Sequence, residues 1–130
     1  MNSVIKNCRI IGNQTISEPT DIIIENGVIS DIGNFGSING YDVDGKYVSA
    51  GFIDIHTHGG NCSDFMDATD EAFDNILKFH LKNGTTAVLA TSLTSPVDLI
   101  KRFLSETRRY MSKPPKYARR IWFRQSATRL

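Results

Sequence analysis

The chain has 130 residues, a formal net charge of +1, 40% hydrophobic residues and 22% charged residues, which is an ordinary globular composition. These values exclude a disordered polar chain, a collagen-like repeat and a small disulfide scaffold. No stretch reaches the roughly 18 apolar residues that a membrane span requires, and the first residues do not form a secretory signal pattern. Cys8 and Cys62 lie far apart, so we expect two reduced thiols in a cytoplasmic protein.

Charge is distributed unevenly along the chain. Residues 1–100 contain 5 Lys/Arg and 13 Asp/Glu, a net charge of −8, whereas residues 101–130 contain 10 Lys/Arg and one acid, a net charge of +9. A basic end of this kind can bind nucleic acid or a membrane surface, but no nucleic-acid-binding motif accompanies it. We therefore predict a solvated helix face followed by an abnormal tail, with neither nucleic acid nor membrane as a partner.

The first 50 residues predict short strands joined by turns. Strands are expected over residues 3–11, 21–25 and 28–33. Asn26-Gly27 is a strong signal for a tight hairpin between the last two of them. A further pair of short strands is expected on either side of Asp44-Gly45. Residues 1–50 are thus predicted to form a small antiparallel β unit.

From residue 51 onward the pattern changes to alternating strands and helices. Strands are predicted over residues 51–58 and 85–93, with helices after each of them. Thr69 and Ser95 are placed to cap the two helices, and the second helix continues to about Met111. This order predicts two βα units with parallel strands. A complete (β/α)₈ barrel needs about 250 residues, so two units form only its beginning.

The segment that carries chemistry is GFIDIHTHGG, Gly51–Gly60. His56 and His58 are two residues apart on a strand, so both imidazoles point to the same face and can chelate one divalent ion. Asp54 lies on that face as well and can accept a hydrogen bond from an imidazole N–H, which fixes the ring. A lone pair of this spacing is often only a surface feature. The apolar strand before it and the glycines and βα unit after it favour a metal site.

Three other polar residues of this region have simpler interpretations. His80 falls on the apolar face of the first predicted helix, where a packing histidine is more common than a ligand. Asp64 and Asp67 are interpreted as loop residues that shape the exit of the histidine strand.

The β unit followed by GFIDIHTHGG resembles the start of the amidohydrolase superfamily. Its continuation resembles the N-acetylglucosamine-6-phosphate deacetylase family over residues 20–118, through DFMD at 64–67, NGTTA at 83–87 and LTSP at 93–96. The resemblance implies a barrel inserted into a small β-sandwich. Residues 1–50 are then the sandwich portion, and residues 51–118 are the first two βα units of an incomplete (β/α)₈ barrel. A dihydroorotase-like enzyme, which shares the histidine pair, is an alternative.

The resemblance also implies an activity, the hydrolysis of N-acetylglucosamine 6-phosphate to glucosamine 6-phosphate and acetate. His56 and His58 become metal ligands with Asp54 supporting them, Zn²⁺ being the first choice and Fe²⁺ the second. The family's metal-binding glutamate, two later histidines and catalytic aspartate have no counterpart in the chain. We therefore assign no catalytic residue and no substrate-binding residue, and expect no activity from the chain alone.

Residues 119–130 contain four arginines and no acid, unlike the segment before them. We predict an aberrant basic tail here, of the kind that a frameshift near codon 119 would produce. A homo-oligomer like those of the family is expected only if the barrel is completed. A non-catalytic relic, or an interaction module that uses the β unit, is the alternative function.

Overall fold

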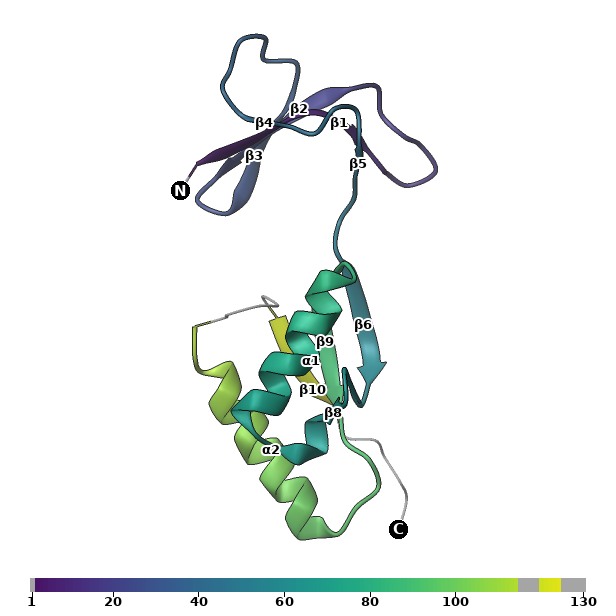
Figure 1. Cartoon of the computed structure of the whole chain (residues 1–130), viewed down its shortest axis with the longest axis vertical. Coiled ribbons are helices and arrows are strands. Elements are labelled where there is room, and N and C mark those ends of the chain that lie inside the picture. The colour runs from purple at the N-terminus through teal and green to yellow at the C-terminus, as the bar shows by residue number, and fades with distance from the viewer. Residues whose placement is uncertain (1, 115–119, 125–130) are drawn as a thin grey trace. The chain divides into compact units, whose positions relative to one another are not determined.

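The computed structural model describes residues 2–114 and 120–124. The chain divides into two compact units, unit 1 (Met1–Ala50) and unit 2 (Gly51–Leu130) (Figure 1). Unit 1 is a small sheet, and unit 2 combines strands with two long helices. Across the two described ranges, no helix combines the length and the apolar character needed to cross a membrane.

Unit 1 is built around its first strand. Its strands are β1 (Ser3–Ile10), β2 (Thr20–Glu25), β3 (Val28–Gly33), β4 (Tyr41–Asp42) and β5 (Tyr47–Val48). β1 pairs with β2, and β2 with β3, in antiparallel fashion. Asn26 and Gly27 have φ values of 52° and 78°, which are the left-handed conformations that a tight hairpin turn requires. The hairpin predicted between β2 and β3 is thus confirmed.

The antiparallel prediction is wrong for the end of unit 1. β4 and β5 do not pair with each other, because both pair with β1 in parallel. Lys6 pairs with Asp42 and Arg9 pairs with Tyr47, so the chain from β4 to β5 contains more residues than the stretch of β1 with which it pairs. The left-handed Asp44-Gly45 turn absorbs the extra residues, and the Gly45 N–H donates to the Asn7 carbonyl over 2.7 Å. Because β4 and β5 both run parallel to β1, the chain does not reverse between them, and the sheet of unit 1 is mixed.

A buried carboxylate ties three parts of unit 1 together. The Asp21 side chain is only 7% exposed and accepts hydrogen bonds from the backbone N–H groups of Asn7, at 2.9 Å, and Phe35, at 3.2 Å. These two bonds lower the pKa of Asp21, because they favour the charged form. Next to it, burial raises the pKa of the Cys8 thiol. Asp21 therefore fastens β1 and the loop after β3 to β2.

Unit 2 contains a parallel sheet with helices between its strands. Its elements are β6 (Phe52–Thr57), β7 (Gly59–Gly60), β8 (Ser63–Asp64), the 3₁₀ turn η1 (Phe65–Asp67), α1 (Asp70–Lys82), β9 (Thr85–Thr91), α2 (Val97–Met111) and β10 (Arg120–Arg124). The sheet order is β10-β9-β6, with β9 in the centre and both pairings parallel. The predicted βα units are present in this sheet.

The caps of the two helices differ from each other. Thr69 caps α1 as predicted, since its hydroxyl accepts a hydrogen bond from the Ala72 N–H at 3.2 Å. The prediction that Ser95 caps α2 is wrong, because Pro96 occupies the cap position and no side chain bonds the first turn. Pro96 has a ψ of 145°, so it lies outside the helix, and α2 starts one residue later than the sequence suggested.

A third parallel strand occupies part of the segment that we expected to be an aberrant tail. Arg120–Arg124 form β10, in register with β9 from Ala87 to Thr91. The strand contains the run Ile121-Trp122-Phe123, and β-branched and aromatic residues favour strands. The prediction of an aberrant tail relied on the charge of the segment and did not take this apolar run into account. The rest of that segment, residues 119 and 125–130, lies outside the described residues.

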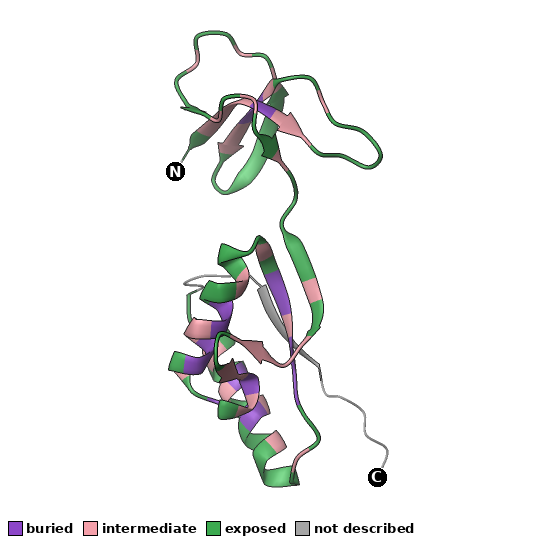
Figure 2. Cartoon of the chain, turned by 45° about the vertical axis from the view of Figure 1, so that its right-hand side comes forward, coloured by how far each residue is buried: buried purple, intermediate pink, exposed green. Residues whose placement is uncertain are grey.

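The core of unit 2 lies between the sheet and the helices (Figure 2). Its buried members are Phe65, Phe73, Ile76, Leu77, Val88, Ala90 and Phe103. β6 is different, because Phe52, Ile53 and Ile55 are 60–66% exposed. Since β6 pairs only with β9 among the described strands, it forms an edge of the sheet with apolar side chains open to solvent.

Candidate metal centre

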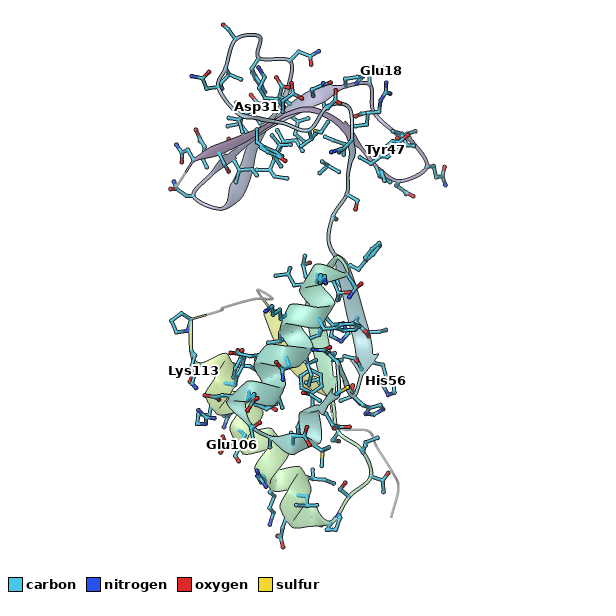
Figure 3. The ribbon with its side chains drawn as sticks, viewed as in Figure 1. Glu18, Asp31, Tyr47, His56, Glu106 and Lys113 are labelled. Carbon is cyan, nitrogen blue, oxygen red and sulfur yellow. The ribbon has the colours of Figure 1, made fainter. Side chains whose placement is uncertain are left out.

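The two histidines lie at the carboxyl end of β6. His56 is on the strand, where Figure 3 labels it, and His58 directly follows the last residue of the strand. Their ring centroids are 5.2 Å apart, with an angle of 72° between the ring planes. His56 is exposed and His58 is half-buried. The structure therefore brings two imidazoles together at the end of a parallel strand, within reach of solvent.

One hydrogen bond fixes the chemistry of the His58 ring. Its Nδ1 lies 3.0 Å from the backbone oxygen of Thr91 at the end of β9. A carbonyl oxygen can only accept, so Nδ1 must carry the proton. The neutral ring then has its lone pair on Nε2, which is the form in which a histidine binds a metal through Nε2.

Asp54 supports the pair through the backbone. Its Oδ1 accepts a hydrogen bond from the backbone N–H of His56 at 3.0 Å. We expected the carboxylate to hold an imidazole N–H, but the contact that forms anchors the main chain of His56 instead. The reason is local, because an aspartate side chain can accept a hydrogen bond from the backbone N–H of the residue two positions after it.

The chain leaves β6 through a tight turn that needs small residues. A Cβ on Gly59 would collide with the backbone oxygen of Ser63 on the neighbouring strand β8, where Gly59 itself pairs with Asp64. The Thr57 hydroxyl donates to the Gly59 carbonyl at 3.1 Å, and His80 Nε2 lies 3.5 Å from the same hydroxyl. His80 thus packs against the turn after the histidine strand, as the interpretation of it as a packing residue predicts.

The DFMD motif has a structural explanation. Asp64 Oδ1 accepts from the Met66 N–H at 2.7 Å, and Asp67 Oδ2 accepts from the Asp64 N–H at 2.9 Å. This reciprocal arrangement is a capping box, and it closes η1 around Phe65, which is fully buried. The two carboxylates therefore hold a loop in shape, and sequence reasoning recognised them only as loop residues.

An ion-pair cluster joins the two helices, and sequence reasoning missed it. Asp70 at the start of α1 bonds Arg109, at 2.6 Å, and Lys113, while Arg109 also bonds Glu106 at 2.6 Å. The Arg109 and Lys113 hydrogen bonds lower the pKa of Asp70, and the Asp70 and Glu106 bonds raise that of Arg109. Only the tertiary packing of α1 against α2 brings Asp70 to Arg109 and Lys113, which lie 39 and 43 positions further along the chain.

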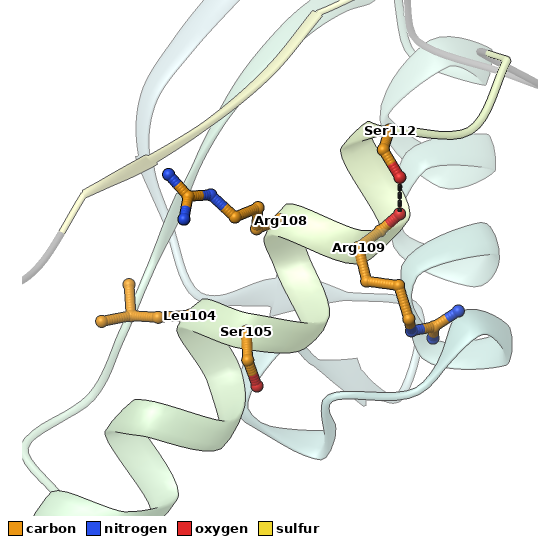
Figure 4. Close-up of a pocket in the computed structure, with 5 residues that line it drawn as sticks. All are labelled: Leu104, Ser105, Arg108, Arg109 and Ser112. Atoms are coloured by element: carbon orange, nitrogen blue, oxygen red, sulfur yellow. Dashed lines mark hydrogen bonds between the residues drawn. The ribbon is translucent and has the colours of Figure 1, made fainter.

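A surface hollow on α2 adjoins this cluster. It is lined by Leu104, Ser105, Arg108, Arg109 and Ser112, and its volume is about 530 Å³ (Figure 4). Ser112 donates to the Arg109 carbonyl at 2.7 Å across its wall. None of these residue types is a metal ligand of the kind that the histidine pair suggests, so the hollow does not contribute to the candidate centre.

The described residues contain no group of three or more His, Cys, Asp or Glu side chains placed to hold a metal ion. Cys62 is exposed and its thiol is free. His56 and His58 together can supply two of the four ligands of a tetrahedral zinc site. The arrangement can therefore begin a metal centre, but within residues 2–114 and 120–124 it does not complete one.

Comparisons with known proteins place this geometry in a family. The model of the amidohydrolase family matches residues 47–115. The chain is 32% identical over 105 residues to an N-acetylglucosamine-6-phosphate deacetylase of Lysinibacillus sphaericus, covering 78% of this chain and 27% of that protein. It is 35% identical over 104 residues to a dihydroorotase of Geobacillus sp., covering 75% of this chain and 23% of that protein. The chain thus spans about a quarter of the length of these curated relatives.

Solved structures agree on the fold. The deacetylase of Pasteurella multocida superposes with a TM-score of 0.75 at 21% identity, covering 95% of this chain and 34% of that one. A deacetylase of Mycobacterium smegmatis, solved in complex with N-acetyl-D-glucosamine-6-phosphate, gives a TM-score of 0.67 at 20% identity, covering 83% and 29%. Since the family model matches more than half of the residues, including both histidines, this chain belongs to the amidohydrolase family.

Proposed function

We propose that this chain supplies the first metal-binding strand of a deacetylase that acts on N-acetylglucosamine 6-phosphate. The observation that carries the proposal is the His56–His58 pair at the end of β6, with Nε2 of His58 left free by the bond to Thr91. The similarity to deacetylases in sequence and in fold supports this substrate class. The substrate partner is then an amino sugar phosphate, and a homo-oligomer would require the completed barrel.

The residues present fit a divalent metal ion. Imidazole nitrogens suit zinc, our first choice, and iron, and His56 and His58 would hold the ion. When bound, such an ion would supply Lewis-acid chemistry, polarising the amide carbonyl and lowering the pKa of a water molecule to about 7. The remaining ligands and the catalytic acid–base group must come from other βα units.

The chain's own contribution is to orient the two imidazoles. β6 is held along β9 by the parallel pairing, and Asp54 anchors the backbone of His56. Neither contact moves a proton of the substrate. We therefore expect the 130-residue chain by itself to show no turnover of N-acetylglucosamine 6-phosphate, measured by acetate release.

A chimera tests the proposed function. Joining this chain in place of the matching part of the Lysinibacillus sphaericus deacetylase is expected to give an enzyme that releases acetate. His56→Ala and His58→Ala should each lower kcat/KM by more than the 10- to 100-fold that loss of a ligand's supporting contact costs. His80→Gln is the matched control, since His80 packs against the same turn and its loss should leave most of the activity.

A dihydroorotase is the second candidate, because the Geobacillus sp. protein is similar over nearly the same share of the chain. The same chain joined to the remainder of that dihydroorotase should form the cyclic amide product only if this candidate is right. Activity in that chimera and none in the deacetylase chimera would contradict our proposal. Two folded but inactive chimeras would also contradict it, and would favour a non-catalytic relic or interaction module.

A further inference from the structure

The His58–Thr91 contact leads to an inference that rests on the proposed function and deepens it. We propose that the main-chain carbonyl of Thr91 is a positioning group, which selects the Nδ1–H tautomer of His58 before any ligand arrives. The bond spans 3.0 Å between His58 Nδ1 and the Thr91 oxygen. It presents Nε2, with its lone pair, as the ligand atom of this ring.

The carbonyl is held firmly enough to perform this selection. Thr91 is fully buried, and its hydroxyl donates to the Leu89 carbonyl at 3.0 Å. β9 is the central strand, paired with β6 through Thr57 and Ala90 and with β10 through Thr91 and Arg124. Because pairing on both sides fixes the backbone of β9, the carbonyl cannot follow a rotating ring. The ring must instead adapt to the carbonyl.

His56 provides the internal contrast. His56 is exposed, and among the described residues no hydrogen bond to its ring is found; Asp54 accepts a hydrogen bond from its backbone N–H instead. An imidazole without a fixed partner exchanges between its two neutral tautomers. The pair thus consists of one preset ligand and one adjustable ligand. The preset member avoids the cost of selecting a tautomer during binding, which is a form of preorganisation.

The tautomer can be measured directly on the metal-free chain. Long-range ¹H–¹⁵N correlation spectra at about pH 8, above the ordinary histidine pKa of about 6.5, distinguish a protonated from an unprotonated ring nitrogen. We expect His58 to be almost entirely the Nδ1–H form and His56 to be a mixture. His58 found mainly as the Nε2–H form in the folded chain would overturn the proposal.

Variants separate the carbonyl from its side chain and from simple packing. Thr91→Val removes the hydroxyl and keeps the carbonyl, so the His58 tautomer should not change. A changed tautomer would assign the selection to the side chain and contradict us.

His58→Asn keeps an N–H near the position of Nδ1, whereas His58→Gln places its amide near Nε2. We expect the urea midpoint to fall less for Asn than for Gln, and an equal or reversed order would count against the bond.

Zinc titration separates this proposal from the proposed function. Added Zn²⁺ should shift Nε2 of His58 in the wild-type chain and leave Nδ1 protonated. If the tautomer is as expected but zinc produces no shift, the positioning role of Thr91 stands and the metal-binding function fails. If zinc shifts Nδ1 of His58 instead, the positioning proposal fails while metal binding stands. The wild-type measurements decide the question even if His58→Gln does not fold.

Discussion

The two units of this chain are stabilised in different ways. Unit 2 has a continuous apolar core that includes Phe65, Phe73 and Phe103. In unit 1 the buried apolar residues among those described are Cys8 and Ile22, and three apolar side chains of the edge strand β3, Val28, Ile29 and Ile32, are at least half exposed. Unit 1 depends instead on its backbone pairing and on the buried Asp21 carboxylate.

The difference follows from whether helices cover the sheet of each unit. The helices of unit 2 bury one face of its sheet, and burial of apolar area is the main favourable term in folding. The described residues of unit 1, 2–50, form no helix that could cover its sheet, so hydrogen bonds contribute a larger share of its stability. We therefore expect the backbone amides of α1 and β9 to exchange with solvent more slowly than those of β1–β3, because exchange reports local stability.

The largest expected effect tests the core of unit 2. Phe73→Ala removes a side chain that is 1% exposed, and truncating a buried phenylalanine typically costs about 3–5 kcal/mol. Phe79→Ala on the same helix is the matched control, because Phe79 is 42% exposed and should cost far less. Urea unfolding checks both variants. Equal losses would show that the apolar core is not what distinguishes unit 2.

An intermediate effect tests the polar anchor of unit 1. Asp21→Asn should lower the melting temperature by about 5 °C, because charge-assisted bonds to two backbone N–H groups are weakened. The pKa of Asp21 lies below its ordinary value of 3.8, so its stabilisation is present above pH 3.8 and is lost as pH falls through the folded-state pKa. The variant should therefore lose less stability on acidification than the wild type does.

Thermal unfolding of Asp21→Asn at several pH values, compared with Glu25→Gln, gives the measurement. Glu25 is exposed at the end of β2, so its variant should match the wild type at neutral pH. An unchanged acid response in Asp21→Asn would mean that the carboxylate does not anchor unit 1.

The smallest expected effect tests the ion pairs between α1 and α2. Asp70 is 47% exposed, and exposed ion pairs contribute little and are screened by salt. Asp70→Asn should lower the melting temperature of unit 2 by about 1–2 °C at low salt and by less at high salt. Because the pKa of Asp70 is lowered mainly by Arg109 and then by Lys113, the effect is present above pH 3.8 and is lost as pH falls through the folded-state pKa. A salt-independent loss would point to packing instead.

Local signals predicted much of the secondary structure. The Asn26-Gly27 hairpin and the Thr69 cap are confirmed, since both depend on residues only a few positions apart. The pairing of β4 and β5 with β1 was not predictable, because a turn signal does not name the strand that accepts the hydrogen bonds. Strand β10 was missed because the arginines around it dominated the composition.

For the candidate metal centre, the sequence by itself predicted which side chains would bind an ion, because two residues of separation along an extended strand place His56 and His58 on a common face. It also indicated the amidohydrolase family. Only the tertiary structure decided how His58 is held, since the Thr91 carbonyl reaches it from the neighbouring strand, 33 residues away. A backbone carbonyl has no residue identity that a sequence could reveal, so its role appears only when parallel pairing brings the two strands together.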